Sequence, residues 1–153
     1  MIRINRRKLI TTSAVLAIAA LTVTTVPAQA LNPNMGTDPG VTASTIKLGI
    51  TSPLTGIAAP GYSKIPGAMK AYFDYVNANG GVNGRKITLV SKDDQYIPTT
   101  AVAKANELIL RDKVFALVGT LGTASTKALT SSTQLSKRGI PSLFVNTGWS
   151  GFA

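Results

Sequence analysis

Cysteine and histidine are both missing from this chain of 153 residues. Without cysteine there is no disulfide framework, and no cysteine side chain can carry a lipid anchor. Any metal site would have to use oxygen ligands alone, since His and Cys supply the usual nitrogen and sulfur ligands. Most arrangements for nucleophilic or general-base catalysis are excluded too, because they depend on one of these two residues. We therefore expect a protein that is not an enzyme and that holds no metal.

Acidic residues are also scarce, with 6 Asp and Glu against 16 Lys and Arg. Four of the cations lie within the first eight residues, so the remainder of the chain has twelve basic and six acidic groups. Most of these twelve cations stand singly, and they do not form the basic stripe with interleaved aromatics that typifies nucleic-acid binding. The composition therefore argues against a nucleic-acid partner.

The N-terminus has the three regions of a secretory signal peptide. Basic residues between Arg3 and Lys8 precede an uncharged run over residues 9–26, and the sequence PAQA at 27–30 ends in a small-x-small pattern. We expect residues 1–30 to be cleaved after Ala30 and the protein to be exported, to the periplasm, the extracellular space or the cell surface. A membrane anchor is the alternative, but several threonines make the run weakly hydrophobic for a spanning helix. The adjacent Arg6 and Arg7 leave Sec and twin-arginine export both open.

The rest of the chain alternates between predicted strands and helices after a flexible leader at 31–44, which is rich in Asn, Pro and Gly. Strands are expected near 45–50, 86–92, 114–118 and 140–145. Helices are expected to begin near residue 63 or 66, after a Thr99 or Thr100 cap, and at the hydroxyl cluster at 123–126, which would lie in the first turn of the third helix. Such alternation predicts an α/β fold with a parallel sheet and helices on both faces.

Apolar periodicity predicts which residues of each helix face the sheet. The expected residues are Ile65, Ala68, Met69, Tyr72, Tyr75 and Val76 in the first helix, Ala101, Ala105, Leu108 and Ile109 in the second, and Ala128, Leu129 and Leu135 in the third. The fourth strand is apolar on both faces, yet the helix expected to follow and cover it is not in this sequence, so we expect the strand to lie exposed at the edge of the sheet.

Ligands of open parallel sheets bind outside the carboxyl ends of the strands. Three loops are expected to meet there, at 51–62, 119–125 and 146–150. They contain no Arg, and two of them are rich in Gly and hydroxyl residues, which suits a small zwitterion or uncharged polar molecule better than a phosphate. Gly119 and Gly122 do not complete a dinucleotide-binding motif, and the sequence before Lys127 lacks the phosphate-loop spacing, so no cofactor is expected.

The stretch 114–126 carries the strongest local signal for a site. An apolar run typical of a strand buried on both faces ends at Gly119, and hydroxyls follow at Thr123, Ser125 and Thr126 before a helical pattern. The N–H groups and partial positive charge at a helix N-terminus hold carboxylates or phosphates well. The alternative is that Thr123 or Ser125 only caps the helix.

Asp93 and Asp94 are adjacent carboxylates in the loop after the second predicted strand. They invite an interpretation as an acid–base pair or as half of a metal site. Adjacent residues of an extended segment point in opposite directions, which makes cooperation between the two awkward. We expect a structural role instead, in which one carboxylate accepts hydrogen bonds from N–H groups of the loop.

Several blocks in residues 41–150 resemble the extracytoplasmic substrate-binding proteins of ABC importers for branched-chain amino acids and related compounds. The most specific block is the helix end Asn-x-x-Gly-Gly-x-Asn-Gly-Arg at 77–85. The blocks are IKLG at 46–49 with PLTG at 53–56, AYFDYVNANGGVNGR at 71–85, Asp93 and Asp94 with Pro98, Ala101 and Val102, VFALVG at 114–119, and GIP at 139–141.

The resemblance implies a type I periplasmic-binding-protein fold, in which two α/β lobes close around the ligand. Residues 45–153 would form part of the N-terminal lobe. Thr123 would hold the ligand's α-carboxylate, and Gly148 and Ser150 would bind it from the loop after the fourth strand, where Trp149 replaces the family's common small residue. Tyr62 would cover the ligand, with ordinary surface packing as the alternative.

The implied partners are a small ligand, namely an amino acid or related polar solute, and an ABC permease in the membrane. The resemblance also implies a monomer at full length. A ligand sensor of the same fold, for amides or aromatic acids, is the second hypothesis, and an exported α/β enzyme is the third. Members of the family are longer than this chain, so we expect a fragment without the second lobe, which usually contacts the ligand's side chain.

Overall fold

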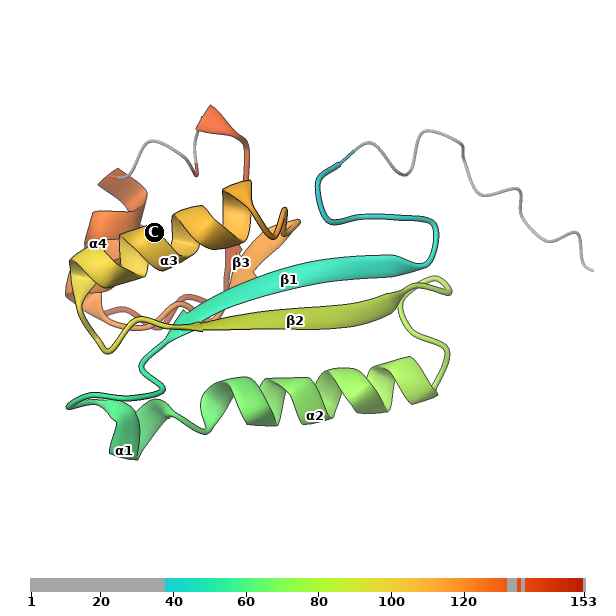
Figure 1. Ribbon diagram of the computed structural model, residues 1–153, viewed down its shortest axis with the longest axis horizontal. Helices are drawn as coiled ribbons and strands as arrows, with labels where there is room; N and C mark the ends of the chain where they lie inside the picture. The colour runs from blue at the N-terminus through green and yellow to red at the C-terminus, as the bar shows by residue number, and fades with distance from the viewer. Residues whose placement is uncertain (1–37, 132–134, 136, 153) are drawn as a thin grey trace, which may run out of the picture. The chain divides into compact units, whose positions relative to one another are not determined.

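The computed structural model describes residues 38–131, 135 and 137–152, so the predicted signal peptide and residues 31–37 of the predicted leader lie outside the described residues. Four strands form one parallel sheet in the order β2-β1-β3-β4 (Figure 1). The predicted α/β class with a parallel sheet is confirmed. The strands are β1 (Thr45–Ser52), β2 (Lys86–Asp93), β3 (Ala116–Val118) and β4 (Ser142–Leu143).

The two long strands β1 and β2 end level with each other. They pair over their full length, with Thr45 opposite Lys86 at one end and Ser52 opposite Asp93 at the other. Their arrowheads in Figure 1 point to the left, where α1, the start of α3 and α4 also lie. The helices are α1 (Ala59–Tyr62), α2 (Ile65–Ala78), α3 (Pro98–Leu110) and α4 (Thr123–Ser131). The loops after the strands are therefore gathered at one edge of the sheet.

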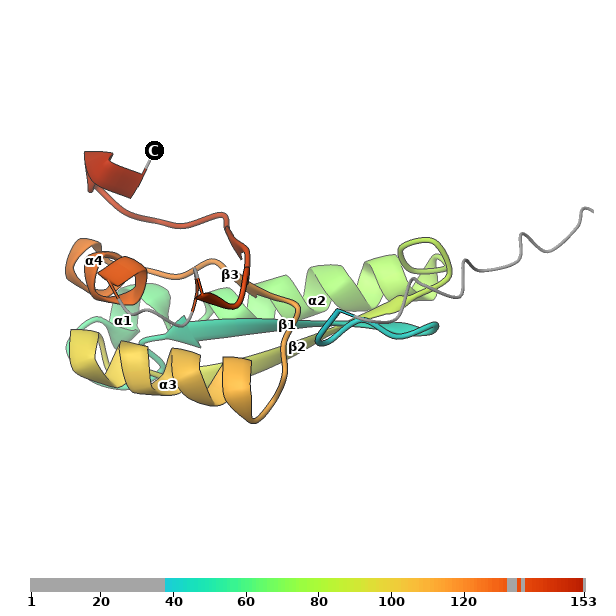
Figure 2. The same cartoon turned by 90° about the horizontal axis from the view of Figure 1, so that it is seen from above.

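Helices cover both faces of the sheet, as predicted. Figure 2 shows α2 and α3 on opposite sides of β1 and β2. The main apolar core lies on the α3 side and joins α3 and α4 to the strands; its members are Ala105, Leu108, Ile109, Val114, Leu117, Leu129 and Leu135. Gly49 of β1 leaves room for this packing, because a Cβ there would lie 3.1 Å from both the Leu108 and the Val114 side chain.

The third and fourth strands are shorter than predicted. β3 begins at Ala116 instead of residue 114, and β4 consists of Ser142 and Leu143 alone. Pro141 has no N–H to donate before β4, and Phe144 after it has a φ of +54°, which is incompatible with an extended strand. This backbone turn at Phe144 accounts for the early end of β4.

Two helix starts also differ from the predictions. Residues 59–62, predicted as part of a loop, form the short helix α1. The predicted Thr99 or Thr100 cap is wrong, because α3 begins at Pro98 and its N-cap residue, Ile97, makes no capping hydrogen bond through its side chain. Proline suits the first helical position since its fixed φ is helical and its missing N–H is not needed there.

The predicted inner face is confirmed for α3, in which Ala101, Ala105, Leu108 and Ile109 are all buried. In α4, Leu129 is buried and Ala128 half-buried, and Leu135 beyond it is buried. The prediction was wrong for part of α2: Tyr72 and Tyr75 are 64% and 67% exposed, and Ala68 is exposed as well. The face turned toward the sheet there contains Ile65, Met69, Phe73 and Val76, which are half-buried.

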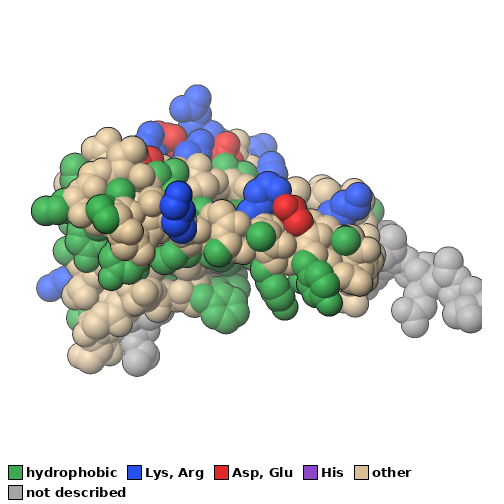
Figure 3. All heavy atoms as spheres, turned by 90° about the horizontal axis from the view of Figure 1, so that it is seen from below, with side chains coloured by type: hydrophobic (Ala, Val, Ile, Leu, Met, Phe, Trp, Pro, Cys, Tyr) green, Lys and Arg blue, Asp and Glu red, His purple; other side chains and the backbone are tan. Residues whose placement is uncertain are grey.

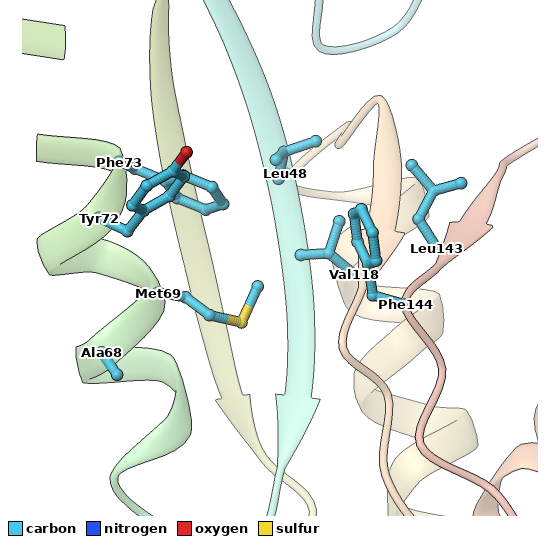
Figure 4. Close-up of a pocket in the computed structure, with 8 residues that line it drawn as sticks. All are labelled: Leu48, Ala68, Met69, Tyr72, Phe73, Val118, Leu143 and Phe144. Carbon is cyan, nitrogen blue, oxygen red and sulfur yellow. The ribbon is translucent and has the colours of Figure 1, made fainter. Parts of the chain in front are cut away.

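An apolar groove of about 460 Å³ lies beside α2 (Figure 4). It is lined by Leu48, Ala68, Met69, Tyr72, Phe73, Val118, Leu143 and Phe144. Phe144 is 84% exposed and Leu143 is 43% exposed, which confirms that the end of the fourth strand is an exposed apolar edge. Figure 3 shows hydrophobic side chains gathered along the bottom edge of the picture. Most of the Lys and Arg side chains in this view lie nearer the top.

The core on the α3 side allows a prediction of how substitutions in α3 change the free energy of unfolding. Leu108 is fully buried whereas Leu110, two residues further along the same helix, is 43% exposed. Leu108→Ala should lower the free energy of unfolding by about 2–5 kcal/mol, because it removes a buried side chain and leaves a cavity. Leu110→Ala is the matched control and should cost at most about 1 kcal/mol. Denaturant unfolding of the complete gene product measures both, and equal losses would contradict the core described above.

Candidate functional site

The N-terminus of α4 lies at the edge where the loops gather. Its first hydrogen bond runs from the Thr126 N–H to the Gly122 carbonyl at 2.8 Å, so the N–H groups of residues 123–125 precede the intrahelical ladder. The hydroxyl cluster predicted at this point is divided between two environments. Ser125 and Thr126 are buried, at 3% and 1% exposure, whereas Thr123 is exposed. Of these three hydroxyl residues, only Thr123 is accessible to a ligand.

Thr123 and Gly148, predicted to share a site, are hydrogen-bonded to each other. The Gly148 N–H donates to Thr123 Oγ1 at 3.2 Å. Two backbone bonds align the same loops: the Gly122 N–H donates to the Asn146 carbonyl at 3.0 Å, and the Asn146 N–H donates to the Thr120 carbonyl at 2.9 Å. The loops 119–125 and 146–150 therefore lie side by side. The Thr123 side chain connects the two loops and does not cap its own helix.

Tyr62 and Ser150 are less closely connected to this pair. Tyr62 is the last residue of α1 and is 38% exposed. Ser150 is exposed and begins the short 3-10 helix η1 (Ser150–Phe152). Within the described part of the chain, neither side chain is hydrogen-bonded to Thr123 or Gly148. Their contact with a ligand remains a prediction.

Asp93 fixes the loop that follows β1. Its Oδ1 accepts hydrogen bonds from the N–H groups of Leu54 at 2.9 Å, Thr55 at 3.2 Å and Gln95 at 3.0 Å, and its Oδ2 accepts from the Thr55 hydroxyl at 2.5 Å. The level ends of β1 and β2 make this reach possible, since Asp93 lies opposite Ser52. The predicted structural role of one carboxylate is confirmed.

The two neighbouring carboxyl groups have pKa values displaced in opposite directions. For Asp93, desolvation tends to raise the pKa, but the Thr55 hydroxyl and the N–H groups of Gln95, Thr55 and Leu54 lower it below the ordinary value of 3.8. For Asp94, which is only 1% exposed, burial raises the pKa despite the opposing hydrogen bond from the Tyr96 N–H. Asp93 therefore favours the folded state once ionised, whereas ionisation of Asp94 opposes folding.

The β2–α3 loop was not among the three predicted ligand loops, yet it is in contact with two of them. Asp93 is bonded to residues 54 and 55, and the Tyr96 ring lies against Gly122, where a Cβ would approach it to 2.8 Å. Gln95 and Tyr96 both have positive φ, at +55° and +64°. That backbone conformation orients Tyr96, and residue composition alone gave no sign of it.

The described residues contain no group of three Asp and Glu side chains placed to share a metal ion. None of the described helices combines the length and apolar character needed to cross a bilayer.

The hydrogen bonds of Asp93 predict a specific acid dependence of stability. The contribution of this carboxylate is present above pH 3.8 and is lost as the pH falls through the lower pKa of the folded state. Asp93→Asn should therefore melt at a lower temperature than the wild type at neutral pH, and the difference should shrink as the pH is lowered to about 3.

Asp74→Asn provides the control, because Asp74 lies on the exposed face of α2 and, within the part of the chain that the structure describes, forms one ion pair, with Lys70 at 2.7 Å. Its melting temperature should differ little from that of the wild type across the same range. A gap between Asp93→Asn and the wild type that stays constant from neutral pH to about pH 3 would contradict the proposed ionic contribution.

Comparison with known proteins identifies relatives of this architecture. The family model described as periplasmic binding protein matches residues 45–153. A curated amino acid binding protein from Pseudomonas aeruginosa is 44% identical over 82 residues, which cover 53% of this chain and 22% of that protein. The chain spans less than a quarter of the length of the curated relatives it matches.

Two solved structures share the fold. One is LivJ from Streptococcus pneumoniae, a branched-chain amino acid transporter substrate-binding protein in complex with isoleucine; its TM-score is 0.64 at 28% identity, covering 71% of this chain and 30% of LivJ. The other is an ABC transporter solute-binding protein from Rhodopseudomonas palustris in complex with 3,4-dihydroxybenzoic acid. Its TM-score is 0.58 at 32% identity, covering 69% of this chain and 28% of that protein.

Proposed function

The chain belongs to the periplasmic binding protein family, and on that premise we propose that it forms part of one lobe of an exported solute-binding protein that delivers an amino acid or related carboxylate to an ABC importer. The hydrogen bond between Thr123 and Gly148 carries this proposal, because it connects the two predicted ligand loops. Thr123 Oγ1 accepts this bond, which leaves the hydroxyl hydrogen free to donate to a ligand.

A carboxylate is the ligand group that this arrangement suits best. The Thr123 hydroxyl lies beside the N–H groups that open α4, and a helix N-terminus favours negative charge. The Gly148 N–H is already used by Thr123, so its carbonyl is the group left to accept a hydrogen bond from a ligand ammonium. Isoleucine and 3,4-dihydroxybenzoic acid, bound by two structural neighbours, share a carboxylate and little else.

The apolar groove beside α2 is a poorer candidate for this ligand. Its eight lining residues are aliphatic or aromatic, and Tyr72 supplies the only side-chain oxygen or nitrogen among them. A zwitterion needs several convergent polar groups to replace its hydration. The N-terminus of α4 offers such groups in its backbone.

Replacement of Thr123 tests the proposal. Thr123→Val keeps the shape of the side chain and removes the hydroxyl, so the affinity of the complete gene product for leucine should fall roughly ten- to a hundredfold, the effect of one charge-assisted hydrogen bond. Thr123→Ser should retain most of the affinity, because it keeps the hydroxyl. Isothermal titration calorimetry with leucine, valine and isoleucine measures these affinities.

Thr130→Val is the matched control on the same helix. Among the described residues, the Thr130 hydroxyl donates to two backbone carbonyls of α4, those of Lys127 at 2.9 Å and Thr126 at 3.2 Å. Its removal should leave affinity within about twofold of the wild type, since surface changes away from the site have small effects. Unchanged leucine affinity in a folded Thr123→Val variant would refute the assigned role.

The proposed export, with cleavage after Ala30, predicts the N-terminal residue of the mature protein. The mature protein secreted by its host should begin at Leu31, which N-terminal sequencing or intact mass measures directly. Ala28→Phe combined with Ala30→Phe should block processing, because the cleavage site requires small side chains at these positions. A mature protein that retains residues 1–30 in the membrane would instead support an anchor.

We further propose that capture involves no covalent step. Leucine incubated with the protein and released by denaturation should be recovered unchanged, as measured by mass spectrometry. A new product that appears in proportion to protein and time would contradict a purely binding role.

A further inference from the structure

Tyr96 occupies an unusual position between the β2–α3 loop and the start of α4. A Cβ at Gly122 would lie 2.8 Å from Cε2 of the Tyr96 ring, 3.2 Å from Cζ and 3.3 Å from Oη. The ring is therefore packed directly on the Gly122 backbone. Gly122 also has a φ of +96°, so glycine is required there for its conformation as well as for the space.

The backbone of the β2–α3 loop holds Tyr96 in this place. The Tyr96 N–H donates to Asp94 Oδ1 at 2.9 Å, and Asp94 is itself buried. The left-handed conformation of Gln95 and Tyr96 is costly for residues with side chains and persists only where surrounding contacts enforce it. The Tyr96 ring is thus presented to Gly122 by a constrained turn.

Gly122 is the residue through which Tyr96 can act on the site. Its carbonyl accepts the first hydrogen bond of α4, and its N–H is bonded to Asn146 in the neighbouring loop. The next residue is Thr123, whose hydroxyl meets Gly148. A shift of Gly122 would therefore move the N–H groups that open α4 and the Thr123 hydroxyl together.

We propose that Tyr96 is a positioning residue for the carboxylate site: its ring, packed on Gly122, fixes the direction of the first turn of α4. This inference rests on the proposed function for the identity of the ligand group. Tyr96 acts through Gly122 and is not required to touch the ligand. The loop that follows β1 is contacted from the same side, by Asp93 at the end of β2 and by the Gln95 carbonyl, which would lie 2.8 Å from a Cβ at Gly56. One constrained turn thereby sets the relative position of two ligand loops.

Leucine and leucinamide distinguish positioning of the carboxylate site from a general loss of stability, because leucinamide lacks the carboxylate. In the complete gene product, Tyr96→Ala should weaken leucine binding about tenfold, the loss of roughly one charge-assisted hydrogen bond, with a much smaller effect on leucinamide. Tyr96→Phe keeps the ring and should bind both ligands within about twofold of the wild type. Tyr75→Ala removes a tyrosine that is 67% exposed on α2 and is the matched control.

Hydrogen exchange provides a measurement that does not depend on any ligand. In Tyr96→Ala, the amides of Thr126 and Gly148 should exchange faster, because their acceptors are the Gly122 carbonyl and Thr123 Oγ1. Amides within α2 should be unchanged. Tyr96→Leu keeps apolar bulk without a flat ring and should accelerate exchange at the same amides to a smaller extent. It replaces the alanine variant in this measurement if the alanine variant does not fold.

The two measurements separate the failure of this inference from the failure of the proposed function. If the wild type binds no carboxylate ligand but Tyr96→Ala accelerates exchange at Thr126 and Gly148, the proposed function is wrong and the positioning of α4 stands. If exchange at these amides is unchanged, or if leucine and leucinamide lose affinity equally in a folded variant, the inference is overturned.

Discussion

The parallel pairing of β1 with β2 over all eight residues is the constraint on which the candidate site depends. It brings Ser52 and Asp93 to the same edge of the sheet, so that the carboxylate of Asp93 reaches the backbone of residues 54 and 55. A register shift of one residue would exchange the faces of every side chain on one strand and would remove this contact. The packing of Val90 of β2 against the core on the α3 side opposes such a shift.

The core on the α3 side also holds the two elements that flank the site. Leu117 of β3 and Leu129 of α4 belong to one apolar cluster, which anchors the strand before the site and the helix after it. Thr123, at the outer end of that helix, stays exposed and joins the loop of Gly148. A ligand bound there would meet polar groups whose positions are set by buried contacts, which reduces the ordering cost of binding.

Much of this arrangement could be predicted from local patterns. The periodicity of α3 identified its four buried residues because each is apolar and small or aliphatic, and hydroxyls after a buried strand indicated Thr123. The face of α2 was harder to predict, since Tyr72 and Tyr75 match an apolar repeat yet tolerate water at their hydroxyl ends. The end of β4 and the proposed role of Tyr96 depend on positive φ values at residues other than glycine. Tertiary contacts impose these backbone conformations, and the local sequence does not reveal them.

The central claim is that a ligand carboxylate binds at the N-terminus of α4, and a crystal structure of the complete gene product with leucine bound tests it most directly. The account predicts a carboxylate oxygen within about 3 Å of Thr123 Oγ1, a normal hydrogen-bond distance, and a second contact with N–H groups that open α4. Leucine bound in the apolar groove beside α2, or with its carboxylate turned away from Thr123, would contradict it.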